Sequence, residues 1–142
     1  MKKNYHFIAI TVLSLLSMTN CQSGVPEINE ANYYEAIKRI KTYENNQPKL
    51  FLTADGRYSE NFWGDKFDVN VEITNDAKIT TYKDVEIRVT YYSKTNSVMT
   101  TNDYILYEVI PPQAVTKVRM KIDNYRDVKS IGWRVIEASP ND

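Results

Sequence analysis

Residues 67–74 read FDVNVEIT, and apolar side chains alternate with polar ones at every position. Successive side chains of a β-strand point to opposite faces of its sheet, so this alternation predicts a strand with one buried and one solvated face. The pattern returns at 84–91 (DVEIRVTY), at 117–122 (KVRMKI) and at 131–136 (IGWRVI). Four such segments in one chain predict a mainly β domain built on antiparallel strands.

Two further segments extend this pattern on its N-terminal side. Residues 50–53 (LFLT) predict a short strand, and the dipeptide Asp55-Gly56 that follows is a turn signal. The stretch 57–66 contains three aromatic side chains, and we therefore expect it to be packed.

On the C-terminal side, residues 104–110 are apolar except for Glu108, and we expect both faces of this segment to be covered. Pro111 and Pro112 end it, because proline cannot donate to a strand ladder. In total the sequence predicts six or seven short strands. The connections between them are too short for the crossovers that parallel strands need, so we expect the strands to be mostly antiparallel. This pattern of short strands predicts a mostly antiparallel β-sandwich or β-barrel.

One amphipathic helix is expected before the strands, at about residues 28–44. Apolar side chains recur there at helical spacing and form one stripe, which consists of Tyr33, Ala36, Ile37, Ile40 and Tyr43. Asn29 or Asn32 is a suitable N-cap, and acidic residues precede basic ones as the helix dipole favours. The stripe needs a surface to cover it, and we expect that surface to be the sheet of the same domain, with a partner's groove as the alternative.

The N-terminus has the plan of a secretory signal: a basic start at Lys2 and Lys3, then an apolar stretch from Phe7 to Met18 that is too short to cross a bilayer comfortably. Residues 18–21 (MTNC) resemble the lipobox of bacterial lipoproteins. The resemblance implies a signal peptide at 1–20, acylation of Cys21 with fatty acids such as palmitate, and a short tether at 21–26. The alternative is an ordinary signal with an unmodified thiol.

Composition narrows the chemistry of the mature domain. The chain has 18 basic and 18 acidic residues, its single histidine lies in the signal, and its single cysteine is Cys21. Without these side chains, triads based on histidine, cysteine nucleophiles and ordinary zinc, haem or iron–sulfur sites are excluded from the mature domain. The absence of a basic cluster argues against nucleic acid. We therefore expect no cofactor, no metal and no catalysis.

Five segments resemble the FxLYD-like group of immunoglobulin-like domains on bacterial envelope proteins: 69–75 (VNVEITN), 82–92 (YKDVEIRVTYY), 110–113 (IPPQ), 118–122 (VRMKI) and 131–138 (IGWRVIEA). The resemblance covers about half of the chain. It implies an immunoglobulin-like sandwich with an accessory or binding role, and it brings no catalytic residues.

The N-terminus resembles those of lipoproteins of the Bacteroidetes. Surface-exported members of that group carry acidic residues just after the cysteine, whereas 22–26 (QSGVP) has none. This difference favours a position facing the periplasm, and the absence of Asp at position 22 favours the outer membrane. The resemblance thus implies a cell-envelope protein that is anchored to the membrane by lipid.

Several side chains are candidates for contact with a ligand or a partner. Trp63, and a stacking platform formed by Tyr92 with Tyr104 or Arg88 across a sheet, would suit sugar rings or peptides, although cross-strand tyrosine pairs also simply stabilise sheets. The basic stripe of Lys117, Arg119 and Lys121 would suit an acidic partner, although such a stripe is usually a solvated strand face.

The carboxylates of Asp55, Glu60 and Asp65 lie near aromatic residues and glycines, as in glycosidase or calcium sites, although neither the setting nor the spacing fits those sites well. We expect a non-enzymatic interaction module for another envelope protein. The alternative is a carbohydrate-binding accessory protein that uses exposed tryptophan and tyrosine.

Overall fold

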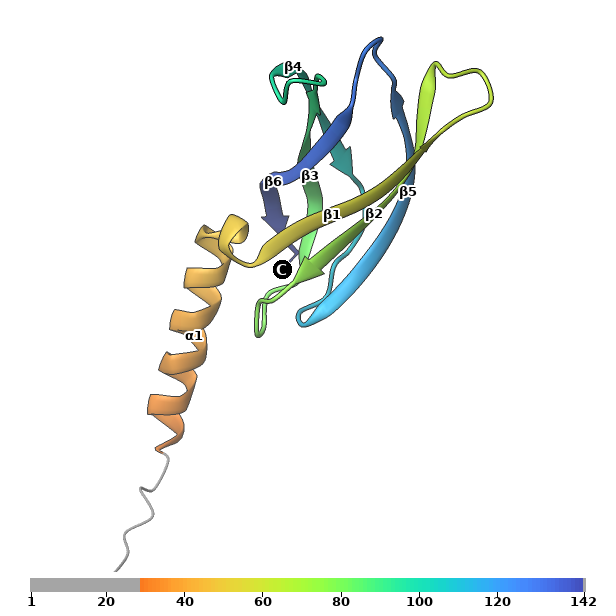
Figure 1. Cartoon of the computed structure of the whole chain (residues 1–142). Coiled ribbons are helices and arrows are strands. Elements are labelled where there is room, and N and C mark those ends of the chain that lie inside the picture. The colour runs from red at the N-terminus through yellow and green to blue at the C-terminus, as the bar shows by residue number, and fades with distance from the viewer. Residues whose placement is uncertain (1–28, 142) are drawn as a thin grey trace, which may run out of the picture.

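The computed structural model describes residues 29–141 and consists of one helix, a short 3-10 turn and six strands (Figure 1). The helix α1 spans Glu30–Asn46 and the turn η1 spans Pro48–Leu50. The strands are β1 (Leu52–Glu60), β2 (Lys66–Asn75), β3 (Tyr82–Tyr92), β4 (Val98–Leu106), β5 (Ala114–Asp123) and β6 (Ser130–Pro140).

The strands form two three-stranded sheets with the orders β1-β2-β5 and β4-β3-β6, and every paired strand is antiparallel. The chain passes from one sheet to the other after β2, after β4 and after β5. The expectation of a mainly β, antiparallel fold with two sheets and one preceding helix is confirmed.

The core lies between the two sheets, and it takes the side chains that the sequence alternation selects. In β2 every second residue from Phe67 to Asn75 is buried, and β3 alternates in the same way from Val85 to Tyr91. The buried apolar set is Leu52, Phe67, Val69, Val71, Ile73, Ala77, Tyr82, Val85, Ile87, Val89, Tyr91, Leu106, Ile110, Ile122, Val135 and Ala138.

Asn75 is the main polar residue of this core. It is fully buried at the end of β2, and its amide nitrogen donates to the backbone oxygens of Thr80, Ile110 and Pro111 at 3.0, 3.1 and 3.0 Å. Its side-chain oxygen accepts from the backbone N–H of Ala77 at 2.9 Å. One side chain therefore connects β2 to both loops that cross between the sheets at this end.

The helix α1 touches the sandwich mainly at its last turn and projects away from it (Figure 1). The Glu44 carboxylate is only 2 % exposed and accepts three backbone N–H groups, from Lys78 at 2.7 Å, from Ile79 at 3.2 Å and from Thr80 at 2.9 Å. The hydroxyl of Tyr82 donates to the Glu44 backbone oxygen at 2.7 Å. We call these contacts the Glu44 latch.

Two expectations for the helix need correction. It runs from 30 to 46 rather than from 28 to 44, with Asn29 as the N-cap that accepts from Ala31 at 3.0 Å. Most of the apolar stripe does not pack on the domain, since Tyr33 is 56 % exposed, and only near the C-terminal end of the helix does Tyr43 meet the Phe51 ring edge to face, with centroids 5.7 Å apart. The latch holds only the C-terminal turn, so the remaining turns extend beyond the sheets.

The dipeptide Asp55-Gly56 is not a turn but lies within β1, paired with Glu72 and Val71. The glycine is required by a contact between sheets. A Cβ atom on Gly56 would lie 2.6 Å from the Trp133 ring of β6, so only glycine admits this ring without displacement. The local turn signal is overridden because β1 must lie close to the other sheet.

The expectation that 104–110 would be covered on both faces is also wrong. β4 ends at Leu106 and is an edge strand, and the chain then leaves the sheet with Tyr107 and Val109 exposed. Only Ile110 returns to the core, where it forms an isolated antiparallel bridge with Tyr82.

Candidate functional site

The sandwich has two unlike ends (Figure 1). We call the end that carries α1 and the C-terminus the proximal end, and the opposite one the distal end. Three turns form the distal end: 61–65 between β1 and β2, 93–97 between β3 and β4, and 124–129 between β5 and β6. The candidate site lies on the first of these turns.

Phe62 and Trp63 lie at the tip of the β1–β2 hairpin, and we call this pair the aromatic tip. Phe62 is 92 % exposed and Trp63 is 81 % exposed, and their rings meet edge to face with centroids 5.2 Å apart. The expectation that this segment would be packed is therefore wrong for both residues. Two large aromatic side chains in water are unfavourable in isolation, which makes an exposed pair a candidate binding surface.

The turn beneath the aromatic tip is internally bonded. Asn61 accepts from the Lys66 backbone at 3.3 Å and donates to the Asp65 carboxylate at 2.8 Å through its side chain. Its backbone N–H donates to the Lys66 oxygen at 2.9 Å, and Gly64 donates back to the Asn61 oxygen at 3.1 Å. Gly64 has a φ of 73°, a conformation that other residues rarely adopt. These bonds fix the shape of the turn.

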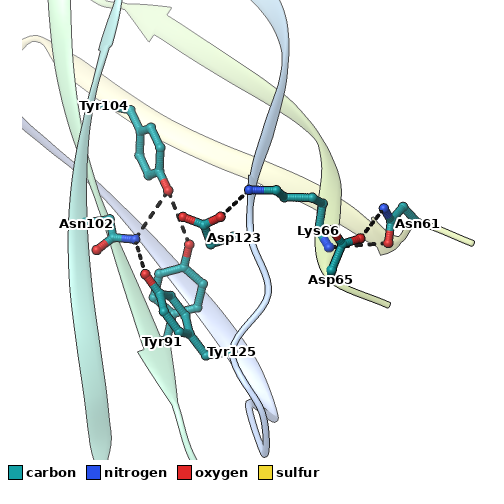
Figure 2. Close-up of polar contacts among 8 residues, drawn as sticks. All are labelled: Asn61, Asp65, Lys66, Tyr91, Asn102, Tyr104, Asp123 and Tyr125. Carbon is teal, nitrogen blue, oxygen red and sulfur yellow. Dashed lines mark hydrogen bonds and ion pairs between the residues drawn. The ribbon is translucent and has the colours of Figure 1, made fainter. Parts of the chain in front are cut away.

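A second turn braces the first from the side. Asn124 donates from its backbone to the Asp65 oxygen and from its side chain to the Gly64 oxygen, both at 3.0 Å. Lys66 forms an ion pair with Asp123 (Figure 2). The hydrogen bond from Asn61 lowers the pKa of the Asp65 carboxyl, which favours its charged, accepting form. The backbone that presents the aromatic tip is thus held from inside and from outside the hairpin.

A tyrosine cluster lies below this turn, and Figure 2 shows it on the other side of the ion pair between Lys66 and Asp123. Asn102 donates to Tyr125 at 2.8 Å and to Tyr104 at 3.4 Å, and the Tyr104 hydroxyl lies 3.5 Å from that of Tyr91. Burial and the contact with Tyr104 raise the pKa of Tyr91, so its hydroxyl stays neutral. The cluster fills the distal end of the core.

The expected stacking platform does not form, because Tyr92 and Tyr104 are not neighbours. Tyr104 pairs with Ile87 and turns toward the core side, whereas Tyr92 lies against Gly132, where an added Cβ would be 3.1 Å from its ring. Arg88 is held instead by Asp103, through two hydrogen bonds of 2.7 Å. Of the three aromatic candidates, only Trp63 is presented to solvent as a large exposed surface.

Lys117, Arg119 and Lys121 lie on the exposed side of β5, opposite the polar side chains of β2. Lys117 forms an ion pair with Glu72 at 3.0 Å, and Lys121 forms one with Asp68 at 3.5 Å. Arg119 is paired with Asn70, which carries no charge. The basic stripe is therefore largely neutralised within its own sheet, except at its centre.

The three carboxylates of the sequence-based acidic group do not converge. Asp55 lies in the middle of β1, Glu60 ends that strand and Asp65 belongs to the turn. At about 3.3 Å per strand residue, Asp55 and Glu60 are separated by roughly 16 Å. Within residues 29–141, no group of three or more potential metal-ligating side chains is found.

Comparisons with protein-family models, with curated proteins and with solved structures found no match for this chain. Cys21, the proposed lipidation site, lies outside the described residues, as do the signal at 1–20 and the tether at 21–26. In the part of the chain that the structure describes, no helix has the length and apolar character needed to cross a bilayer.

Proposed function

We propose that this chain is a lipid-anchored, non-catalytic binding module of a bacterial cell envelope, and that it binds another envelope protein through the aromatic tip. The lipid anchor would be Cys21, eight residues before the N-cap Asn29. The most favoured location is the outer membrane, with the domain facing the periplasm. The module would need no cofactor.

One observation carries this proposal: two almost fully exposed aromatic side chains are mounted on a turn that is bonded on both sides. Tryptophan and other large aromatic residues supply much of the affinity at protein interfaces, because each buries a large apolar area. A turn that is already fixed loses little conformational entropy on binding. More of the free energy gained by burying the aromatic rings is therefore retained as affinity.

The position of the tip agrees with an anchored protein. Since α1 has 17 residues, at 1.5 Å per residue it is about 25 Å long. It joins the proximal end, whereas the aromatic tip lies at the distal end (Figure 1). A domain fixed to the membrane through the chain before α1 would therefore present the tip away from that membrane.

A second candidate is binding of carbohydrate through the indole of Trp63. An exposed tryptophan ring on a hydrogen-bonded turn offers an apolar face on which a sugar ring can stack. The Phe62 ring meets the indole edge to face, with an interplanar angle of 87°. The two rings therefore do not form a pair of parallel surfaces between which a sugar ring could lie. This geometry suits a protein surface of irregular shape at least as well as a sugar.

The test is capture of partners from the native envelope by the full-length tagged protein. We expect the double variant Phe62→Ser/Trp63→Ser to lose the main captured protein. The matched control is Tyr107→Ser, which removes an aromatic residue that is 79 % exposed at the proximal end. Equal capture by wild type and the tip variant would contradict the proposal. Loss with the control alone would move the site to the proximal end.

Fluorescence separates the two candidates. The chain has two tryptophans, so the variant Trp133→Phe leaves Trp63 as the single reporter. We expect its emission to shift when the captured protein is added and to stay constant in titrations with neutral oligosaccharides. A shift with sugar and none with protein would favour the second candidate. Mass spectrometry of the N-terminal fragment tests whether the Cys21 thiol carries lipid.

A further inference from the structure

The outer face of the β1-β2-β5 sheet carries two arginines at the same level. Arg57 of β1 pairs with Asn70 of β2, and Asn70 pairs with Arg119 of β5, so the three residues form one row across the sheet. All three are exposed. Neighbouring strands lie about 4.8 Å apart, which places the two arginine backbones roughly 10 Å apart. Both guanidinium groups can therefore reach one ligand group above Asn70.

The other charged side chains of this face are already engaged. Glu72 pairs with Lys117 at 3.0 Å, Asp68 pairs with Lys121 at 3.5 Å, and the Asp55 carboxylate accepts from the Gly56 backbone at 2.7 Å. Among the residues the structure describes, no ion pair within 4 Å is found for Arg57 or Arg119. Two guanidinium groups without an ion pair thus remain at the centre of a face whose lysines are paired with carboxylates.

The same row lies in a shallow depression. A hollow of about 490 Å³ is lined by Arg57, Asn70 and Arg119 together with Asp55 and Glu72. A second hollow of about 550 Å³ adjoins it along β2 and β5 and shares Asn70 and Arg119. Asn70 and Arg119 line both open hollows, which we refer to together as the groove.

We propose that this groove binds a saccharide that carries a carboxylate or sulfate group. The planar guanidinium groups of Arg57 and Arg119 match such an anion with paired hydrogen bonds. The amide of Asn70 and the carboxylates of Asp55 and Glu72 offer acceptors for sugar hydroxyls. The same carboxylates repel a ligand that carries a negative charge on every unit, such as a nucleic acid or a polyglutamate. They therefore favour a hydroxyl-rich chain whose anionic groups are spaced apart.

This groove lies on a sheet face and the aromatic tip lies on a turn, so the two sites can be tested separately. The probes are polygalacturonate for carboxylated sugars, dextran sulfate for sulfated sugars, and neutral dextran and polyglutamate as comparisons. We expect full-length protein in detergent to bind at least one of the anionic saccharides and neither comparison probe. Binding is measured by titration calorimetry at low and at physiological ionic strength, because surface charge pairs weaken with salt.

Variants identify the residues. A hydrogen bond to a charged group is typically worth enough to change affinity by about tenfold or more, so Arg57→Gln/Arg119→Gln should reduce binding by more than about tenfold. Arg57→Lys keeps the charge but loses the paired geometry, and an intermediate loss is expected. The matched control is Arg134→Gln, which removes one positive charge from the other sheet and should change affinity less than about twofold.

Three results would overturn the proposal. They are no binding of either anionic saccharide, equal binding by wild type and the double arginine variant, and tighter binding of polyglutamate than of either saccharide. Circular dichroism and the thermal midpoint of each variant establish that it is folded before binding is compared. Loss of saccharide binding in the Arg57→Gln/Arg119→Gln variant with capture through the aromatic tip intact would separate this site from the proposed function.

Discussion

The proximal and distal ends of the sandwich differ in which polar side chains they bury and which apolar side chains they expose. At the proximal end the carboxylate of Glu44 and the amide of Asn75 are buried, and each of their polar atoms has a hydrogen-bond partner. At the distal end Phe62 and Trp63 are exposed, and the polar side chains beneath them do the bracing. Buried polar groups cost free energy unless they are satisfied, and exposed aromatic groups add little to folding.

The difference indicates a division of roles. The proximal end fixes how the helix and the crossing loops join the sandwich, since Glu44 connects α1 to the β2–β3 loop and Asn75 connects that loop to the β4–β5 loop. The distal end carries Phe62 and Trp63, the two most exposed large aromatic side chains of residues 29–141, and it is the end that we propose for contact. Substitutions at the proximal end should therefore reduce stability without removing binding contacts, and substitutions at the tip should do the reverse.

The largest effect on stability is expected from Asn75→Ala. The change leaves the backbone N–H of Ala77 and the oxygens of Thr80, Ile110 and Pro111 without the bonds that this side chain supplies. Because unsatisfied buried groups cost about 1–3 kcal/mol each and some will find water, we expect a loss of about 3 kcal/mol in the free energy of unfolding, measured by urea denaturation.

The matched control for that change is Asn70→Ala, on the exposed face of the same strand. It should alter the free energy of unfolding by less than about 0.5 kcal/mol. If Asn75→Ala and Asn70→Ala reduced the free energy of unfolding equally, the hydrogen bonds of Asn75 would add no stability. The proposed difference between the two ends would then be wrong.

The next effect is the pH dependence that Glu44 introduces. Burial raises the pKa of its carboxyl, but the hydrogen bonds from Lys78, Ile79 and Thr80 outweigh burial and bring the pKa below 4.5. The folded state therefore holds this proton less tightly than the unfolded state. The resulting stabilisation is complete above the unfolded value of about 4.5 and is lost as pH falls through the lower folded value.

Glu44→Gln tests this linkage directly. An amide can accept fewer of the three N–H bonds, so we expect a loss of about 1–3 kcal/mol at neutral pH. Between neutral pH and about pH 3, the unfolding free energy of the variant should fall less steeply than that of wild type. The control Glu35→Gln changes an exposed carboxylate on the same helix and should preserve the wild-type slope. Parallel curves for Glu44→Gln and wild type would exclude the latch as the acid-sensitive group.

The strands could be predicted from the sequence because their alternation is local and strong. Residues 67–74 specify which face is buried without reference to the rest of the chain, and β2 forms with that alternation. Gly56 shows the limit. It suggested a turn with Asp55, but its role is set by Trp133, which lies 77 residues further along the chain. A contact between residues so far apart in the sequence depends on the tertiary structure, and it cannot be recognised from the residues next to Gly56.

The functional residues were less predictable for a related reason. Trp63 was named as a candidate contact residue, but the segment around it was expected to pack because large aromatic residues usually do, and Phe62 was not named. Only the three-dimensional arrangement shows that both side chains are exposed on one turn. Glu44 did leave a signal. It is an acid in the last turn of a helix that has no basic residue there, which opposes the helix dipole and suggests compensating donors outside the helix.

The smallest effect on stability is expected at the aromatic tip. Phe62→Ser/Trp63→Ser removes two of the largest side chains of the chain, yet both lie almost wholly in water and only their mutual ring contact is lost. We expect the free energy of unfolding to change by less than about 0.5 kcal/mol, against about 3 kcal/mol for Asn75→Ala measured beside it. A loss above about 1 kcal/mol would show that the tip packs against the domain in solution and would remove the reason for treating it as a binding surface. Unchanged stability together with lost capture would separate binding from folding at the distal end, because the turn bonds through Asn61 and Asn124 remain in the variant.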